Sequence, residues 1–292
     1  MTINKVILCG LGALGLTYAC KLKGCCELKI LVDEKRFAKF KASPPVFNNN
    51  EQTFDYILPN EKHNADLIII ATKANGLVSA IEYIKNFVDK NTIIISLING
   101  ISSEDKIRSA YPNTTVLNSY FIGHSAMKLG NKFYQDGIGK IVFEPNKKLE
   151  DFFKKNKIDY EVSENIIYSQ WQKLGVNIVL NQLSALKNLT VGELRGKKDY
   201  QIYAKNLLRE VLAVAQAFGI KNLDNYIQDV LDAANLIADD GITSMLQDVR
   251  SKRKTEVDIF SGEIIRLAKK IGIKTPYNED VYNKIKLLEK EF

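Results

Sequence analysis

The feature that most constrains this fold is a glycine pattern near the start of the chain. Gly10, Gly12 and Gly15 fit G-x-G-x-x-G, with an apolar run of strand type at 6–9 before them and a helix-compatible run at 13–23 directly after. In dinucleotide-binding folds the first glycine makes a tight turn, the second lets the backbone approach a pyrophosphate, and the third lets helix and strand pack closely. An ordinary glycine-bearing turn without a ligand has the same letters, but the position between a strand and a helix favours a dinucleotide site.

Composition and charge narrow the class of protein. With 292 residues, 46% of them hydrophobic and 26% charged, the chain is typical of a soluble globular protein of two domains. Its net charge of +7 suits an anionic cofactor and an anionic small substrate. Lysines and acids are interspersed and no arginine-rich block occurs, so we expect no nucleic-acid partner.

Cysteine usage and hydropathy bear on the cellular compartment. The four cysteines have no metal-ligand spacing, and the adjacent Cys25 and Cys26 are poor disulfide partners, so we expect reduced thiols and no metal site. The first residues could pass for a signal peptide, but three glycines interrupt their apolar part. No apolar stretch approaches the length of a membrane span. The prediction is a cytoplasmic protein without membrane contact.

Segments of strand type alternate with helical segments as far as residue 165. Apolar runs typical of strands occur at 28–32, 66–72, 92–98, 115–121, 139–143 and 158–162. This alternation predicts an α/β fold with a doubly wound Rossmann sheet over residues 1–165. The stretch 43–64, rich in proline and asparagine, is typical of a loop or a short irregular hairpin.

From residue 166 to residue 292 the pattern is helical throughout. Helix candidates cover 165–188, 199–218, 224–238, 243–252 and 256–271, with a last one after Pro276. Gly219 and Gly272 are expected to end helices, and Gly262, inside a helical pattern, indicates close packing of another helix. The pattern therefore predicts a second, all-helical domain over residues 166–292.

Polar residues follow several of the predicted strands. Asp33, Lys73 and Asn99 stand at such places, as does Gly10. Because ligands of doubly wound sheets bind beyond the carboxyl ends of the strands, we expect these residues on one ligand-binding rim. A solvated lysine and an ordinary Asn-Gly turn would have the same pattern.

The identity of the dinucleotide depends on the residues after the second strand. Asp33 lies about 20 residues beyond the glycines, where an acid usually bonds the ribose hydroxyls of NAD. Lys35 and Arg36 follow closely and could instead hold a ribose 2′-phosphate, or form a solvated helix start. The sequence leaves both cofactors open at this point.

A second constellation lies at the start of the helical domain. Lys173, Asn177 and Asn181 are spaced i, i+4, i+8, which places them on one stripe of a helix with mostly apolar neighbours. A solvent-facing stripe is the commonest use of such spacing, but two asparagines, which are poor helix formers, favour a binding site in so apolar a setting. From spacing alone, Ser244 is a residue near a helix start and Glu256 a first-turn acid.

Taken together, these segments resemble one enzyme family. The sequence resembles ketopantoate reductase (2-dehydropantoate 2-reductase) nearly end to end, most specifically in the lysine–asparagine helix and in 244–248. The other matching segments are 10–15, Lys73-Ala74, Asn99-Gly100, His124-Ser125-Ala126, 171–174, 192–194 and 255–258. Three positions differ from the family pattern: Asp33 replaces a frequent arginine, Gln182 a frequent proline, and Val191 an asparagine that binds substrate in some members.

The resemblance implies an active site in the cleft between a Rossmann domain and a helical domain. It implies NADPH-dependent reduction of 2-dehydropantoate to pantoate, on the route to pantothenate and coenzyme A, with NADH as the alternative cofactor. We expect a monomer or a homodimer. Carried over by position, Lys173 is the general acid, and the substrate ligands are Asn99, Lys173, Asn177, Asn181 and Ser244. The cofactor ligands are Gly10, Leu11, Gly12, Ala13, Leu14, Gly15, Asp33, Arg36, Lys73, Asn99, Ala126 and Glu256.

The residues available suit this chemistry. Reduction of a 2-oxo acid needs a hydride, which a nicotinamide supplies, a proton donor for the new alkoxide, and donors for the carboxylate. The chain has two histidines, and His63 lies in a loop-like stretch, so a lysine is the more obvious acid. Two alternatives stay open: a related NAD(P)H-dependent reductase of another branched 2-oxo acid, and a non-catalytic dinucleotide sensor, which would not need a proton donor.

Overall fold

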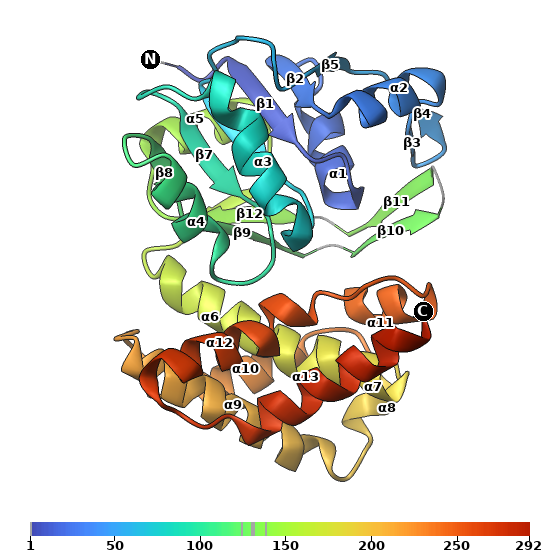
Figure 1. The fold of residues 1–292 in the computed structure, drawn as a ribbon, viewed down its shortest axis with the longest axis vertical. Coiled ribbons are helices and arrows are strands. Elements are labelled where there is room, and N and C mark those ends of the chain that lie inside the picture. Colours follow the sequence, from blue (N-terminus) through green and yellow to red (C-terminus); the bar gives the residue numbers. More distant parts are fainter. Residues whose placement is uncertain (1, 124, 130–131, 138) are drawn as a thin grey trace. The chain divides into compact units, whose positions relative to one another are not determined.

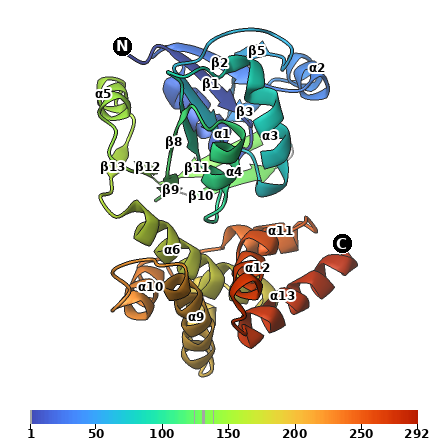
Figure 2. The same cartoon turned by 60° about the vertical axis from the view of Figure 1, so that its left-hand side comes forward.

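The chain forms two compact units, Met1–Ile166 and Ile167–Phe292 (Figure 1). The structure, a computed structural model, describes residues 2–123, 125–129, 132–137 and 139–292. Strands occur in the first unit, and the described elements of the second unit are helices (Figure 2). Within the described ranges, no helix combines the length and the apolar character that a membrane span requires.

The first unit is built on a six-stranded parallel sheet. Its strands are β1 (Lys5–Cys9), β2 (Glu27–Leu31), β5 (Asp55–Ile57), β6 (Leu67–Ile70), β7 (Ile93–Ser96) and β8 (Thr115–Leu117). They lie in the order β5-β2-β1-β6-β7-β8, and every neighbouring pair is parallel. The order reverses between β1 and β6, which is the switch point of a Rossmann sheet, where ligands of such folds bind. The predicted doubly wound fold is confirmed.

Helices cover both faces of this sheet, because its strands are apolar on both sides. Successive side chains of a strand point to opposite faces. In β1, Val6 and Leu8 pack in a core with α1 (Ala13–Leu22), whereas Ile7 and Cys9 pack with α3 (Leu77–Tyr83) and α4 (Ser103–Ala110). Further helical elements of this unit are α2 (Glu34–Ala42), α5 (Lys147–Lys155) and the short 3₁₀ turns Ala74–Gly76 and Ile84–Phe87.

Two smaller sheets complete the first unit. The strands β9 (Ser119–Ile122), β12 (Lys140–Phe143) and β13 (Tyr160–Val162) form their own sheet, so the runs predicted at 139–143 and 158–162 are strands outside the main one. The other sheet has the order β10-β11-β3-β4, from β3 (Val46–Phe47), β4 (Asn50–Glu51), β10 (Ser125–Leu129) and β11 (Lys132–Asp136). Its β3–β4 hairpin turns at Asn48 and Asn49, both with positive φ, as a tight hairpin turn requires.

The second unit is a helical assembly. Its elements are α6 (Ile166–Val176), a π-helical segment (Asn177–Gln182), α7 (Leu183–Lys187), α8 (Val191–Arg195), α9 (Tyr200–Ala217), α10 (Tyr226–Asn235), α11 (Ser244–Arg250), a 3₁₀ turn (Val257–Ile259), α12 (Ser261–Ile271), α13 (Pro276–Leu288) and a terminal 3₁₀ turn (Glu289–Glu291). The helix predicted at 165–188 therefore contains a π-helical stretch. The helix predicted at 256–271 is wrong in its first turns, because the chain breaks at Phe260 and α12 begins after it.

Three glycines of this unit behave as the sequence predicts. Gly219 and Gly272 have φ of +74° and +72°, the left-handed conformation that commonly follows a helix. A Cβ on Gly262 would lie 3.0 Å from Cε2 of Tyr282 on α13, so close helix packing at this glycine is confirmed.

The short α8 was not predicted, although Thr190 and Glu193 begin it with a capping box.

Candidate active site

The three glycines after β1 differ in their surroundings as a dinucleotide turn requires. Gly10 has φ of +105°, and a Cβ there would lie 2.8 Å from the carbonyl carbon of Ala71. A Cβ on Gly15 would lie 1.8 Å from the carbonyl oxygen of Gly10, so this glycine allows α1 to pack directly on the turn. A Cβ on Gly12 would meet nothing within 4 Å. The first glycine therefore serves the turn, the third serves packing, and the second leaves the backbone open to a ligand.

The N-terminus of α1 is suited to an anion. Gly12 is its N-cap and supplies no side-chain cap, and the first turn carries no acidic residue. Leu11 is buried in the core, and Ala13 and Leu14 pack partly against it, so these residues would offer a ligand their backbone N–H groups. Uncapped N–H groups at the positive end of a helix bind phosphates. The turn therefore fits the pyrophosphate of a dinucleotide.

The other residues predicted on this rim follow neighbouring strands of the same sheet. Asp33 comes after β2, Lys73 after β6 and Asn99 after β7. The strands are parallel and in register with β1, so these residues and the glycine turn share the carboxyl edge of the sheet. Lys73 is exposed, and Asn99 is half-buried beside Gly100, whose φ is +96°.

Asp33 and Arg36 are bound to each other. Asp33 is the N-cap of α2, where Oδ1 accepts a hydrogen bond from the backbone N–H of Arg36 at 2.7 Å. The second carboxylate oxygen, Oδ2, forms an ion pair with the Arg36 guanidinium. The acid that would favour NAD and the cation that would favour NADP therefore neutralise each other, and a cofactor would meet them as one pair.

Sequence reasoning missed a buried acid in the first turn of α4. Glu104, 2% exposed, accepts hydrogen bonds from Ser103 Oγ at 2.8 Å and from the backbone N–H of Ser119 at 3.3 Å. The hydroxyl of Ser119 in turn donates to the carbonyl of Ser96, the last residue of β7, at 2.9 Å. Burial raises the pKa of the Glu104 carboxyl above its ordinary value. In the sequence, Glu104 looks like an acid placed at a helix start for the helix dipole.

In the second unit, three predicted site residues form one hydrogen-bonded chain. Asn181 Oδ1 accepts from Ser244 Oγ at 3.1 Å and from the backbone N–H of Met245 at 3.2 Å. Asn181 Nδ2 donates to Asn177 Oδ1 at 2.7 Å. Ser244 lies 63 positions from Asn181 and is brought there as the first residue of α11, after its N-cap Thr243. The structure therefore brings Asn177, Asn181 and Ser244 together.

One donor among these hydrogen-bonded side chains has no acceptor in the described part of the chain. Asn177 Nδ2 is buried and has no hydrogen-bond partner among the described residues. The orientation of the amide follows from its neighbours, because a backbone N–H can only donate, so Asn181 presents its oxygen to Met245 and its nitrogen to Asn177. A buried donor without a partner costs about 1–3 kcal/mol. Such a group calls for an explanation, and a bound acceptor would satisfy it.

Other predicted residues lie as follows. Lys173 is half-buried in the last turn of α6, one helical turn before Asn177. Glu256 is half-buried at the N-cap position of a 3₁₀ turn, but its side chain makes no capping hydrogen bond there. Ala126 lies in β10, where it pairs with Gln135, and its side chain is outside the described part of the chain. His124 is outside the described residues.

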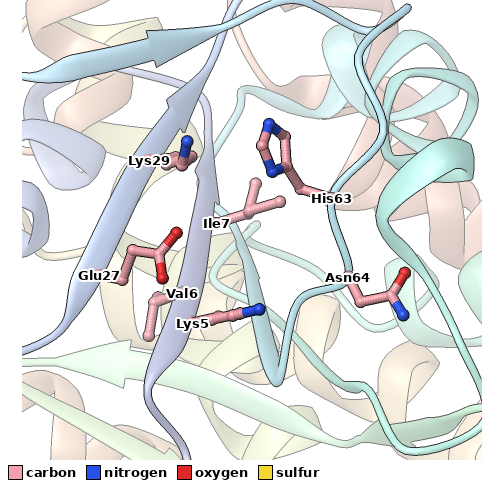
Figure 3. Close-up of a pocket in the computed structure, with 7 residues that line it drawn as sticks. All are labelled: Lys5, Val6, Ile7, Glu27, Lys29, His63 and Asn64. Carbon is pink, nitrogen blue, oxygen red and sulfur yellow. The ribbon is translucent and has the colours of Figure 1, made fainter.

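Two hollows in the described part of the first unit are lined by none of the predicted site residues. A cavity of about 10 Å³, room for roughly one water, lies among Lys5, Glu27 and His63 (Figure 3). It adjoins the first residues of β1 and β2, and thus the opposite edge of the sheet from the glycine turn. The Nε2 atom of His63 lies 3.7 Å from a carboxylate oxygen of Glu61. A wider hollow of about 520 Å³ is lined by parts of α2 and β5. The described residues hold no cluster of three or more side chains suited to a metal ion.

Comparison with known proteins decides the family. One family model, ketopantoate reductase PanE/ApbA, matches residues 6–148, and a second, for the C-terminal part of the same family, matches residues 165–289. The chain belongs to the ketopantoate reductase family. It is 29% identical over 288 residues to a 2-dehydropantoate 2-reductase of Streptococcus pyogenes serotype M6, a likeness that covers 93% of this chain and 94% of the relative.

Solved structures share the fold at lower identity. A complex of D-mandelate dehydrogenase with NADH superposes with a TM-score of 0.87 at 24% identity, covering 99% of both chains. A ketopantoate reductase of the PanE/ApbA family from Ralstonia eutropha JMP134 superposes with a TM-score of 0.83, also at 24% identity, covering 98% of this chain and 99% of that one. At this identity both confirm the architecture alone. This ketopantoate reductase family member is thus an oxidoreductase with a Rossmann sheet and a helical C-terminal region.

Proposed function

We propose that this chain reduces 2-dehydropantoate to pantoate with NADPH, in pantothenate biosynthesis. The observation that carries the proposal is the unpaired, buried Nδ2 of Asn177, one helical turn from Lys173, in a member of the ketopantoate reductase family. A donor kept without a partner inside the protein fits a site that is completed by an acceptor-rich ligand. A 2-oxo acid is such a ligand, because its carboxylate and carbonyl groups offer acceptors only.

The first unit would hold the dinucleotide. Gly12, where a Cβ would meet nothing within 4 Å, and the uncapped start of α1 would take the pyrophosphate. When bound, the nicotinamide supplies the hydride that reduces the carbonyl carbon. Lys73, Asn99, Ala126 and Glu256 are proposed on the cofactor side, and Asn99 would also contact the substrate.

The second unit would supply the proton and the substrate ligands. Lys173 would stabilise the negative charge that develops on the carbonyl oxygen and then donate its proton to the alkoxide. Asn177 would donate Nδ2 to the substrate, while Asn181 and Ser244 hold the Asn177 amide in place and line the site. We propose the region 1–165 as the dinucleotide-binding domain and 166–292 as the substrate-binding domain.

A related reductase of a different 2-oxo acid is the second candidate. Val191 stands where some family members have a substrate-binding asparagine, and its side chain is completely buried at the start of α8. A valine offers no hydrogen bond to a substrate hydroxyl. A substrate without such a hydroxyl would lose nothing by this replacement, whereas 2-dehydropantoate, which carries one, would lose a partner.

Turnover measurements test both candidates. NADPH oxidation is followed with 2-dehydropantoate and with a panel of branched 2-oxo acids, and the series is repeated with NADH. The proposal requires 2-dehydropantoate to have the highest kcat/KM. In Lys173→Ala, kcat should fall at least about 100-fold, the usual loss of a general acid, while the Kd of the dinucleotide stays within about twofold. Near-normal turnover in this variant, or dinucleotide binding without turnover of any oxo acid, contradicts the proposal.

A further inference from the structure

The substrate residues proposed above lie in an unusual stretch of helix. Asn177 is the first residue and Gln182 the last residue of the π-helical segment that joins α6 to α7. In a π-helix each N–H bonds the carbonyl five residues back, and such segments are rare and short. A return to α-helical bonding would remove one residue from the turn. With 3.6 residues per turn, the helix on one side would rotate by about 100° relative to the other side. The segment therefore needs support from outside the helix.

Gln182 provides this support through hydrogen bonds of its side chain. Its side chain is completely buried. Its amide nitrogen donates to the carbonyl of Ile178 at 3.3 Å, the acceptor that the backbone N–H of Gln182 would take in an α-helix. The same nitrogen donates to Ser261 Oγ at 2.7 Å, and its amide oxygen accepts from the backbone N–H of Ser261 at 3.1 Å. One side chain thus bonds both the π-helical segment and a residue 79 positions away.

Ser261, the partner of Gln182, is itself held in place by other helices. It is the first residue of α12, and the N-cap residue, Phe260, makes no side-chain cap, so Gln182 satisfies an N–H that the helix itself leaves open. The hydroxyl of Ser261 donates to Asn278 Oδ1 on α13 at 2.7 Å. Asn278 Nδ2 donates to Glu210 Oε2 on α9, also at 2.7 Å. The bonds of Gln182 therefore tie the end of the π-helical segment to three helices.

We infer that Gln182 is a positioning residue for substrate binding: it holds the π-helical segment in the register that places Asn177 and Asn181. Asn181 directly precedes Gln182, and its amide must face Met245 and Asn177 at the same time. If Gln182 could not bond Ile178 and Ser261, the segment would relax toward α-helical bonding and the two asparagine side chains would turn away from these partners. This inference rests on the proposed role of the asparagines in substrate binding.

The test compares Gln182→Leu with Asn278→Leu. Both replacements remove a completely buried amide from the same network, but the amide of Asn278 does not bond the π-helical segment. We expect a similar fall in Tm for both variants. In Gln182→Leu, KM for the 2-oxo acid should rise at least about tenfold, because small misplacement of binding groups is costly, while KM for the dinucleotide stays within about twofold. In Asn278→Leu both KM values should stay near those of the wild type.

A double-mutant cycle shows whether Gln182 acts through Asn177. Once Asn177→Leu has removed the substrate contact, adding Gln182→Leu should raise KM for the oxo acid less than about twofold further. Additive effects overturn the inference, as do an unchanged oxo-acid KM in Gln182→Leu and an equal rise in Asn278→Leu.

Hydrogen exchange of the amides in 177–183 supplies a readout that does not depend on turnover. Exchange should be at least about tenfold faster in Gln182→Leu than in Asn278→Leu, and equal rates overturn the inference. If the wild type reduces no oxo acid but this exchange difference holds, then the proposed function fails and the positioning of the segment by Gln182 stands.

Discussion

Replacing Asn177 and Asn181 by leucine should separate ligand binding from stability. Asn181→Leu removes three hydrogen bonds and leaves the buried Met245 without the acceptor for its backbone N–H, so the free energy of unfolding should fall by about 2–3 kcal/mol. Asn177→Leu removes one of these bonds and leaves Asn181 Nδ2 without its acceptor, but it also removes the unpaired donor of Asn177, whose burial costs about 1–3 kcal/mol. These two effects oppose each other, so the free energy of unfolding should stay within about 1 kcal/mol of the wild type.

The measurement is urea unfolding followed by tryptophan fluorescence. Trp171 is the one tryptophan of the chain and is buried in α6, so its signal reports the helical unit. Both leucine variants should raise KM for the oxo acid, although only Asn181→Leu should lower the urea midpoint by a large amount. If Asn177→Leu destabilises the unit as much as Asn181→Leu, the reasoning about the unpaired donor is wrong. If both variants keep a normal KM, the asparagines are not substrate ligands.

Three further predictions concern the first unit. Gly12→Ala should weaken dinucleotide binding at least about tenfold, with a Tm close to that of the wild type. Gly15→Ala should instead lower Tm strongly, because its Cβ would overlap the carbonyl oxygen of Gly10. Calorimetric titration measures the first effect and thermal unfolding the second, and the opposite pattern would show that the roles are exchanged. Asp33→Asn should raise the ratio of kcat/KM for NADPH to kcat/KM for NADH, and Arg36→Ala should lower this ratio, because each variant frees the other residue from the ion pair. If neither variant changes the ratio, the ion pair does not determine the choice of cofactor. Because the pKa of Glu104 is raised, the folded chain keeps a proton that the unfolded chain releases near pH 4.3. The free energy of unfolding of the wild type, measured relative to that of Glu104→Gln, should therefore fall as pH rises above about 4. It should level off once the folded carboxyl has ionised. A difference that is constant from pH 4 to pH 8 would contradict this.

Five of the six strands of the Rossmann sheet could be predicted because their signals are local, whereas β5 lies in the stretch 43–64, which was predicted to be a loop or a short hairpin. A strand such as 67–70 is apolar at every position, which only a sheet covered on both faces tolerates, and the glycine turn has fixed spacing. The four-stranded sheet could not be predicted in the same way. A short hairpin was one of the two structures predicted for 43–64, and β3 and β4 form one. However, β3 has two residues and pairs with β11 far along the chain, and nothing in the neighbouring residues indicates that pairing.

The site was predictable to the same extent. Spacing placed Asn177 and Asn181 side by side, and their contact is confirmed, because residues four apart are neighbours in an α-helix and remain so in the slightly wider π-helix. Ser244 was predicted by the family resemblance and not by spacing. The π-helical register itself was not predicted. It coincides with hydrogen bonds from Gln182 to Ser261, and a contact between such distant residues leaves no periodic trace in the sequence.

The direction of these hydrogen bonds limits what the helical unit would bind. Because Asn181 must accept from Met245 N–H, it donates to Asn177 Oδ1, and the group of Asn177 that is left without a partner among the described residues is its Nδ2 donor. Lys173, one turn earlier on the helix, also carries donors only. A ligand that pairs with both of these donor groups must therefore present acceptors, as the carboxylate and carbonyl groups of a 2-oxo acid do, whereas an ammonium cation would leave donors facing donors. A non-catalytic dinucleotide sensor would not need an unpaired buried donor at Asn177. This donor therefore favours a reductase over a sensor.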